Sequence, residues 1–191
     1  MGASQRQGVG VTDEWVVLLD EQRRPIGRQL KSEVHHSDTP LHLAFSVHVF
    51  DDDDNTLLTR RAVTKRAWPG VWTNACCGHP APEEDLVAAV TRRLSSELGL
   101  VPQTVSLALA DFAYRARDAA GVVENEVCPV FRARVPGRRP SPVADSDEVA
   151  EWVWLSRSAV ARLAREYPWL LSPWSVLQFA ELDATARNAS D

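Results

Sequence analysis

The chain has 191 residues, of which 45% are hydrophobic and 25% charged, and its formal net charge is -5. This length suits one domain with a buried core, and the mildly acidic balance argues against broad binding to nucleic acid or to a membrane surface. Three cysteines make a poor disulfide framework, and neither a membrane-spanning apolar run nor a signal peptide is evident. We therefore predict a cytoplasmic protein without nucleic-acid partners or membrane insertion.

We predict one domain over residues 13–187, because the chain shows no internal repeat and no low-complexity segment. Residues 1–12 are polar and contain glycine, which is typical of a flexible arm, and residues 188–191 are expected to form a short tail. No pattern in the sequence fixes the oligomeric state, and we expect a monomer or a weak oligomer.

The domain is expected to begin with a β-hairpin. Short apolar runs at 15–19 and 26–30 flank a turn-like segment, and a polar loop over 31–40 follows. The clearest strand is 41–50, in which Leu, Phe and Val alternate with other residues. The second face of this strand carries His42, Ala44, Ser46 and His48. A run of four aspartates then predicts a solvated turn before a partner strand at 57–61.

One amphipathic helix is predicted over residues 82–99. Pro82 suits the first helical position, and Gly99 suits the C-cap. The buried stripe would consist of Leu86, Val90, Leu94 and Leu98, which repeat at intervals of four. Arg93 and Glu97 are also four apart, and they share another face of the helix.

The second half of the domain is predicted to supply further strands and two helices. Strands are expected at 105–115, 122–135 and 152–155. Ser156 can cap a helix that runs to about residue 166, and a closing helix spans about 174–187. The predicted fold class is therefore α/β, in the α+β sense, with a mixed sheet between helices on its faces.

Three histidines and two glutamates could form a metal site. His35, His42 and His79 come from three predicted elements, although a lone histidine in such a position is more often structural. Glu124 and Glu126 are two apart on a predicted strand, so their side chains leave the same face. Two such carboxylates are costly to bury unless they hold a cation or share a proton. The set suits a divalent transition metal, zinc or manganese among the candidates, but no ligand pair has a zinc-finger or HExxH interval.

The stretch 60–80 is rich in basic residues, tryptophan and cysteine. Its basic residues are Arg60, Arg61, Lys65 and Arg66, and Lys31 lies near the histidine loop. Such residues ordinarily form a solvated face, but two nearby tryptophans and a predicted helix N-terminus favour a ligand that carries phosphate. Cys77 is the best candidate for a nucleophile or an acid, because a metal, His79 and the helix dipole could all shift its pKa. Cys76 is expected to serve packing.

Residues 78–100 resemble the Nudix box, G-x5-E-x7-R-E-U-x-E-E-x-G-U, in which U is a bulky aliphatic residue. The matching residues are Gly78, Glu84, Arg92, Leu94, Glu97, Gly99 and Leu100. Arg93 and Ser96 stand where Nudix hydrolases have two of the three glutamates that hold catalytic magnesium. The resemblance implies a Nudix-type mixed sheet sandwiched between helices, with the N-terminal hairpin as an addition. The two missing carboxylates argue against ordinary Nudix hydrolysis.

One branch of this superfamily accounts for these departures. The sequence resembles the type I isopentenyl-diphosphate isomerases in His35-x-x-Asp38-Thr39, LHLAFS from Leu41, TKRAWPGVWTNACCGHP from Thr64, ENEVCPVF from Glu124 and SPW from Ser172. These enzymes interconvert isopentenyl and dimethylallyl diphosphate. The resemblance implies an isomerase of isoprenoid biosynthesis that acts on a small allylic or homoallylic diphosphate through a carbocation-like state.

The same resemblance implies roles for individual residues. One divalent metal, Mn2+, Zn2+ or Mg2+, would be held by His35, His42, His79, Glu124 and Glu126. The catalytic residues would be Cys77 and Glu126, assisted by Tyr114, with Trp174 closing the pocket. The diphosphate would bind Lys31, Arg61, Lys65 and Arg93, and Glu97 would hold a Mg2+ that bridges to it. Which of Cys77 and Glu126 is the acid, and which the base, is left open.

Two other functions are compatible with a Nudix scaffold. A Nudix hydrolase of a small diphosphate would release phosphate and would tolerate a change at Cys77. A catalytically silent ligand-binding module would be expected to have lost Cys77, Glu126 or part of the metal set, and the chain retains all of them. The expected function is isomerisation.

Overall fold

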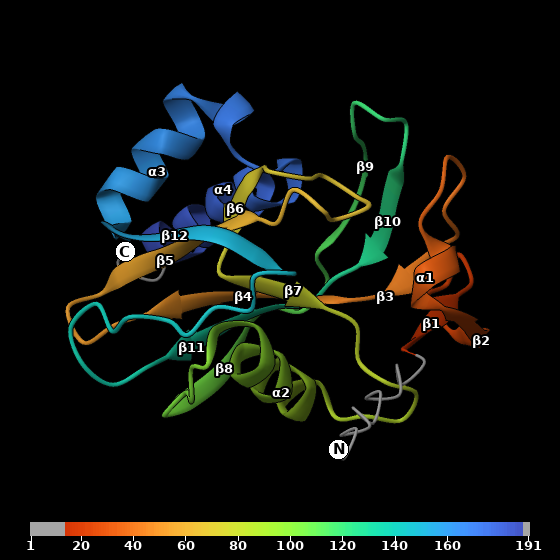
Figure 1. Cartoon of the computed structure of the whole chain (residues 1–191), viewed down its shortest axis with the longest axis horizontal. Coiled ribbons are helices and arrows are strands. Elements are labelled where there is room, and N and C mark those ends of the chain that lie inside the picture. Colours follow the sequence, from red (N-terminus) through yellow and green to blue (C-terminus); the bar gives the residue numbers. More distant parts are fainter. Residues whose placement is uncertain (1–13, 189–191) are drawn as a thin grey trace, which may run out of the picture.

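The computed structural model describes residues 14–188, which form two mixed β-sheets with helices packed around them (Figure 1). The five-stranded sheet contains β1 (Trp15–Leu19), β2 (Pro25–Leu30), β3 (His42–Leu43), β9 (Ala113–Arg117) and β10 (Val123–Val127). The seven-stranded sheet contains β4 (Phe45–Phe50), β5 (Asn55–Arg61), β6 (Trp72–Asn74), β7 (Cys76–Gly78), β8 (Thr104–Leu109), β11 (Val130–Arg134) and β12 (Val149–Ser156). The helices are α1 (Lys31–Val34), α2 (Leu86–Leu98), α3 (Arg157–Glu166) and α4 (Pro173–Asn188), with a 3-10 turn at Pro168–Leu170. The predicted arm at 1–12 lies outside the described residues, and so does the predicted tail apart from Asn188.

Extended segments that the sequence predicts as single strands are shared between the two sheets. The strand order is β2-β1-β3-β10-β9 in the first sheet and β12-β5-β4-β11-β8 in the second, with β6 beside β5 and β7 beside β4. The predicted strand 41–50 breaks at Ala44 into β3, which pairs with β10, and β4, which pairs with β11. The predicted strands 105–115 and 122–135 also break in two, so these three predictions of continuous strands were wrong. Pro129 lies at one break, where it has no N–H to continue a ladder.

Helix α2 begins later than the sequence predicts. Asp85 is its N-cap and accepts a hydrogen bond from the Ala88 N–H at 3.0 Å, so Pro82 lies before the helix and not in its first turn. Glu83 has a φ of 65°, a conformation that no helix contains. At the other end Gly99 forms the predicted C-cap with a φ of 62°.

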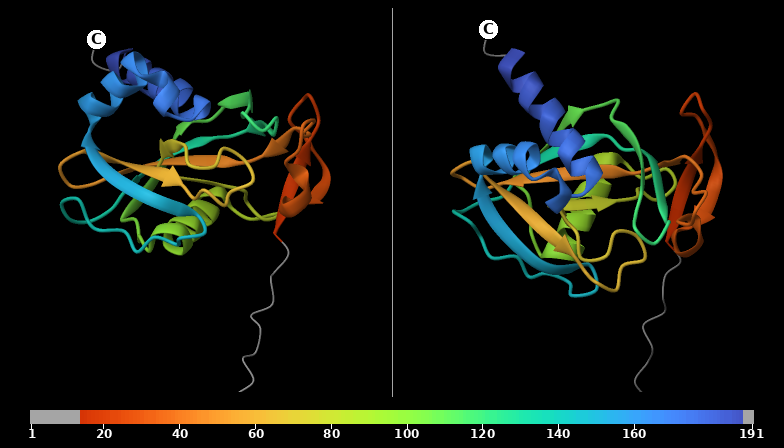
Figure 2. Two further views of the ribbon diagram at one scale, coloured as in Figure 1. Left: turned by 45° about the horizontal axis from the view of Figure 1, so that its top comes forward. Right: turned by 90° about the horizontal axis from the view of Figure 1, so that it is seen from above.

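The seven-stranded sheet is enclosed between helices, as Figure 2 shows from two further directions. On one face the buried Val90, Leu94 and Leu98 of α2 pack in one core cluster with residues of the sheet such as Phe45. Helices α3 and α4 cover the other face, where a second core cluster includes Phe179 of α4. The predicted α+β class, with a mixed sheet between helices, is therefore confirmed, and the hairpin of β1 and β2 lies at one side of the molecule (Figure 1).

Several local predictions were confirmed and others were incomplete. Ser156 caps α3 by accepting a hydrogen bond from the Ala159 N–H at 3.2 Å, as expected. The segment 31–40, predicted as a loop, begins with α1, which buries Val34. Strands β6 and β7 have three residues each, too short for a period-two pattern to reveal them. No helix in the described range 14–188 is long and apolar enough to cross a membrane.

The observed start of α2 predicts the effect of changing its cap. Asp85→Ala should lower the free energy of unfolding by about 1 kcal/mol, because one N–H of the first turn loses its acceptor. Asp85→Ser should keep most of the stability, since serine also caps. Urea unfolding monitored by circular dichroism measures both variants. If the helix began at Pro82, serine would be no better than alanine at this position.

Candidate active site

A cavity of about 690 Å³ collects most of the residues to which the sequence assigns a function. The predicted residues that line it are Lys31, His35, Arg61, Lys65, Cys77, His79, Arg93, Tyr114, Glu124, Glu126 and Trp174. They come from both sheets, from α1, α2 and α4, and from the connecting loops. The other two predicted residues, His42 and Glu97, contact side chains of the lining: His42 lies 3.5 Å from Glu126, and Glu97 lies 2.5 Å from Arg93.

Three imidazoles surround one carboxylate in this cavity wall. His35 follows α1, His42 lies on β3 and His79 follows β7, and their ring centroids are 5.2, 5.5 and 5.1 Å apart. Oε1 of Glu126, on β10, lies 3.5 Å from Nε2 of His42 and 3.4 Å from Nε2 of His79. One ligand atom from each of these four residues lies within 4.8 Å of all the others. Ligands about 2 Å from a shared ion lie at most about 4 Å apart, so small side-chain movements would let this group hold one divalent metal.

Glu124 adds a second carboxylate beside this group. Its Oε2 lies 3.0 Å from Nε2 of His35. Glu124 and Glu126 are both buried and line the same cavity, whereas the intervening Asn125 donates to the carbonyl of Thr39 at 3.2 Å. The predicted placement of the two glutamates on one face of a strand is therefore confirmed.

The hydrogen bonding of the imidazoles suits a cation ligand set. Nδ1 of His42 donates to the carbonyl of Pro40 at 2.9 Å, so Nε2 keeps a free lone pair. Among residues 14–188, no group makes a hydrogen bond of good geometry to Nε2 of His42, to either ring nitrogen of His79 or to Oε2 of Glu124, although all are buried. The imidazole nitrogens and carboxylate oxygens of the group lie close together without such a bond, at 3.0–3.5 Å. Burial lowers the pKa of His79 to about 3, so its ring is neutral and can offer a lone pair. Buried polar atoms left unpaired in this way are the atoms that a metal ion would satisfy.

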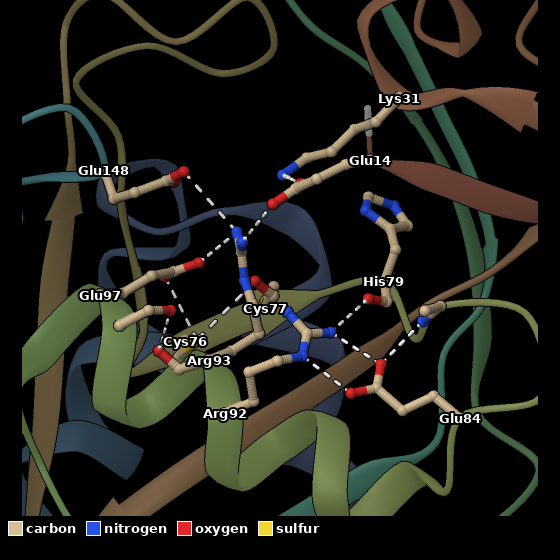
Figure 3. Close-up of polar contacts among 12 residues, drawn as sticks. Glu14, Lys31, Cys76, Cys77, His79, Glu84, Arg92, Arg93, Glu97 and Glu148 are labelled. Atoms are coloured by element: carbon tan, nitrogen blue, oxygen red, sulfur yellow. Dashed lines mark hydrogen bonds and ion pairs between the residues drawn. The ribbon is translucent and has the colours of Figure 1, made fainter. Parts of the chain in front are cut away.

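A network of ion pairs around Arg93 forms another part of the cavity wall (Figure 3). The Arg93 guanidinium lies 2.5 Å from Oε1 of Glu97, 3.1 Å from Oε1 of Glu14 and 3.6 Å from Oε1 of Glu148. Burial alone would lower the pKa of Arg93, but these three carboxylates raise it above its ordinary value. The residue that replaces a Nudix glutamate is therefore a buried cation among carboxylates.

The other predicted diphosphate ligands also have partners in the structure. Nζ of Lys31 lies 2.5 Å from Oε2 of Glu14, and Lys65 is paired with Glu148. The Arg61 guanidinium donates to the carbonyl of Ala67 at 3.2 and 2.9 Å and lies 5.7 Å from the ring centroid of Trp174. Sequence reasoning missed Glu14 and Glu148, because neither belongs to a motif.

Cys77 lines the cavity between two polar side chains that the sequence prediction did not single out. Its sulfur lies 3.2 Å from Oγ of Ser46 and 3.4 Å from Oδ1 of Asn74. Burial, together with the carboxylate of Glu126, raises the pKa of Cys77 to about 11. The expected help from a helix dipole was wrong, because α2 begins at Leu86 and no residue of its first turn lines this cavity.

Aromatic rings form the apolar part of the wall. The ring of Trp174 lies 5.4 Å from that of Tyr114 and 5.7 Å from that of Trp68, centroid to centroid. Nε1 of Trp174 donates to Oδ1 of Asn74 at 3.1 Å, and the tryptophan side chain is almost completely buried. Asn74 therefore contacts both the predicted thiol and the predicted closing tryptophan.

Two matched residues of the Nudix box hold the segment that carries His79 (Figure 3). The Arg92 guanidinium binds both oxygens of Glu84 at 2.7 Å, and Glu84 accepts a hydrogen bond from the Ala81 N–H at 2.8 Å. Arg92 also lies 3.5 Å from the carbonyl oxygen of His79. A bidentate pair of this kind fixes geometry as well as charge, so it ties the loop after β7 to α2.

Comparisons with known proteins agree with this fold. The family model of the NUDIX domain matches residues 40–174. The chain is 51% identical to the isopentenyl-diphosphate Delta-isomerase of Frankia alni, over 94% of this chain and 93% of that protein. It is 54% identical to the enzyme of the same name from Mycolicibacterium vanbaalenii, over 94% and 97%.

Solved structures show the same fold at low sequence identity. A protein from Deinococcus radiodurans superposes with a TM-score of 0.58 at 15% identity, over 80% of this chain and 90% of that chain. The NUDIX domain of Shewanella oneidensis NrtR, solved with ADP ribose, gives a TM-score of 0.54 at 19% identity, over 78% and 88%.

The network around Arg93 makes a prediction about stability. Arg93→Met should lower the free energy of unfolding by about 3–5 kcal/mol, because it leaves buried carboxylates without their cation. Arg93→Met combined with Glu97→Leu should recover part of this loss. Denaturant unfolding of the three proteins measures it, and a single variant as stable as the original chain would show that the network does not support the fold.

Proposed function

The chain belongs to the isopentenyl-diphosphate Delta-isomerases of the Nudix family, and we propose that Cys77 and Glu126 move the two protons of the reaction. The isomerase transposes a double bond by one carbon between isopentenyl and dimethylallyl diphosphate. One carbon must gain a proton while another carbon loses one, through a state that resembles a tertiary carbocation. An acid and a base within reach of the same substrate suit this reaction.

The placement of Cys77 and Glu126 carries this proposal. The thiol comes from β7 of one sheet and the carboxylate from β10 of the other, and both line the same cavity. Either group can be the acid in one direction of the reaction and the base in the other. The remaining walls supply what the substrate needs: cations for the diphosphate and aromatic rings for the hydrocarbon.

The structure of α2 supports isomerisation rather than hydrolysis. Two of the three positions at which hydrolases carry metal-binding glutamates are Arg93 and Ser96. The Arg93 guanidinium is held among carboxylates, and the hydroxyl of Ser96 donates to the main-chain carbonyl of Arg93 at 3.3 Å. Neither side chain can take the place of a carboxylate ligand, so Glu97 alone remains of that set.

We assign the diphosphate to Lys31, Arg61, Lys65 and Arg93. Glu14 now bridges Lys31 and Arg93, and Glu148 lies between Lys65 and Arg93. A diphosphate carries more negative charge than a carboxylate and can bind several cations at once, so it can displace Glu14 from its two partners. We assign to Glu97, whose carboxylate lies beside Arg93, the binding of the Mg2+ that would accompany the diphosphate.

We assign the divalent metal to a site made of His35, His42, His79, Glu124 and Glu126. The neutral imidazole of His79 and the unpaired buried atoms described above fit Mn2+, Zn2+ or Mg2+. A bound ion would fix the orientation of Glu126 and change its affinity for a proton. Two imidazoles also orient the Glu126 carboxylate, because the ring nitrogens of His42 and His79 lie against its Oε1.

Trp174 and Tyr114 are assigned to the carbocation-like state. A ring face stabilises a cation by about 2 kcal/mol or more when both are desolvated. Trp174 is held by its hydrogen bond to Asn74, so its ring keeps one orientation in the wall. The apolar surroundings also keep out water, which would otherwise hydrate the cation to an alcohol.

All three cysteines of the chain, Cys76, Cys77 and Cys128, are free thiols. A catalytic thiol that must exchange a proton has to stay reduced. This supports the proposal that the protein works in a reducing compartment such as the cytoplasm.

The reaction can be followed with isopentenyl diphosphate in heavy water. We expect the alkene signals in the NMR spectrum to change to those of dimethylallyl diphosphate, with deuterium incorporated and no phosphate released. Phosphate release without migration of the double bond would contradict isomerisation, and an unchanged substrate would indicate a binding module.

The two proton-transfer groups can be tested separately. Cys77→Ala and Glu126→Gln should each lower kcat by about 10²–10⁴-fold, because a positioned acid or base contributes this much. Glu151→Gln, at an exposed carboxylate of β12, serves as the control and should retain full activity. Near-normal turnover by either cavity variant, with its fold intact, would show that its role is assigned wrongly.

Metal content tests the ligand set without relying on activity. After incubation with Mn2+ or Zn2+ and removal of the free ion, elemental analysis of the original chain should give one tightly bound ion per chain, apart from any Mg2+ with substrate. His42→Ala should lose this ion, because Nε2 of His42 is one of the ligand atoms. His36→Asn, outside the cluster, should keep it. Equal metal content in all three proteins would rule out this site.

A further inference from the structure

A row of buried, hydrogen-bonded side chains lies behind Cys77 and has no role in the proposed function. It joins Ser46 and His48 on β4 to Gln178 on α4, and all three residues are completely buried. Ser46 lies directly opposite Cys77 in the antiparallel pairing of β4 with β7. The face of β4 that carries Ser46 and His48 was recognised in the sequence by its alternation. Polar groups at such depth are retained only where they are bonded to one another.

The hydrogen bonds of these side chains lead from the protein interior to the sulfur of Cys77. Nε2 of His48 lies 3.0 Å from Oε1 of Gln178, and Nε2 of Gln178 donates to Oγ of Ser46 at 2.9 Å. Oγ of Ser46 then lies 3.2 Å from Sγ of Cys77. A second sulfur, that of Cys128, is slightly farther from the same oxygen, at 3.4 Å.

His48 determines the direction of these hydrogen bonds. Its complete burial, with the positive charge of Arg132 nearby, lowers the pKa of His48 to about 4, so the ring carries one proton. Nδ1 of His48 is buried and has no partner within residues 14–188. A bare lone pair is more easily left unpaired there than an N–H group, which places the proton on Nε2. Oε1 of Gln178 therefore accepts from His48, and the amide N–H faces Ser46.

The hydroxyl of Ser46 can therefore donate towards Cys77. Its oxygen accepts from Gln178, which leaves its own hydrogen for the nearer sulfur, and the thiol of Cys77 donates its hydrogen to Oδ1 of Asn74 at 3.4 Å. On the other side of that sulfur, the amide nitrogen of Asn74 is occupied by two main-chain carbonyls at 3.1 and 2.8 Å. Asn74 therefore presents only its oxygen to Cys77. The sulfur lies between one donor and one acceptor.

We propose that Ser46 is a positioning residue of the isomerase, whose hydroxyl, oriented by Gln178 and His48, holds the Cys77 sulfur at the cavity wall. This inference rests on the proposed proton-transfer role of Cys77. The Ser46 proton stays on its oxygen throughout, and the proton that reaches or leaves the substrate is that of Cys77. A hydrogen bond to a charged acceptor is roughly twice as strong as one between neutral groups. The contact therefore strengthens whenever the proton has left the sulfur.

Steady-state kinetics with isopentenyl diphosphate test the role of Ser46. Ser46→Ala should lower kcat by about 10- to 100-fold, the effect of losing a hydrogen bond to a charged group. The KM should stay within about twofold, because the diphosphate ligands are unchanged. Gln178→Met should lower kcat in the same way but by less. Thr56→Val, which removes another buried hydroxyl of the seven-stranded sheet, should leave kcat unchanged.

A double variant distinguishes positioning from general damage. If Gln178 acts through Ser46, the loss of kcat in the Ser46→Ala and Gln178→Met double variant should be no larger than that of Ser46→Ala alone. Losses that multiply would overturn the inference, and so would a Ser46→Ala protein that keeps kcat within twofold or changes only KM. Should Ser46→Ala fail to fold, Gln178→Met decides by the same split between kcat and KM. An active Cys77→Ala protein would instead contradict the proposed function itself.

Discussion

The site depends on placing one buried carboxylate among three imidazoles. Glu126 is 5% exposed, and its Oε1 lies against ring nitrogens of His42 and His79. A carboxylate buried without compensation would destabilise the fold by several kcal/mol. The imidazoles can lie beside this carboxylate only because β3, β10 and the end of β7 come together. They meet where the chain passes from the five-stranded to the seven-stranded sheet. The same crossing brings Cys77 to the cavity, so the proposed metal ligands and the thiol are positioned by the same part of the fold.

The second constraint is the charge of Arg93. In a hydrolase this position of α2 would carry a glutamate, and here a buried cation is surrounded by Glu14, Glu97 and Glu148. The reversal of charge replaces a metal-binding carboxylate with a cation, and we propose that this face of the helix binds the diphosphate. The neighbouring pair of Arg92 and Glu84 keeps the rest of the box structural, because it holds the loop that follows β7. The scaffold is thus preserved while the chemistry changes.

Much of the site could be predicted from local spacing, and the rest depended on contacts that spacing does not encode. The interval between Glu124 and Glu126 predicted a shared face, and the alternation of 41–50 separated Ser46 and His48 from the apolar residues. The breaks in three strands were missed, since a period-two pattern continues across them. Glu14 and Glu148 were missed because they pair with residues 79 and 83 positions away. The motifs identified the chemistry, whereas the tertiary fold supplied its counter-charges.

The most direct test of this account is anomalous X-ray diffraction from crystals grown with Mn2+, Mg2+ and an unreactive analogue of the diphosphate. We expect a manganese peak about 2 Å from imidazole nitrogens of His35, His42 and His79. We also expect the two phosphorus atoms beside Lys31 and Arg93, with Glu14 displaced. Manganese found only among Glu14, Glu97 and Glu148, with no ion at the imidazoles, would contradict it.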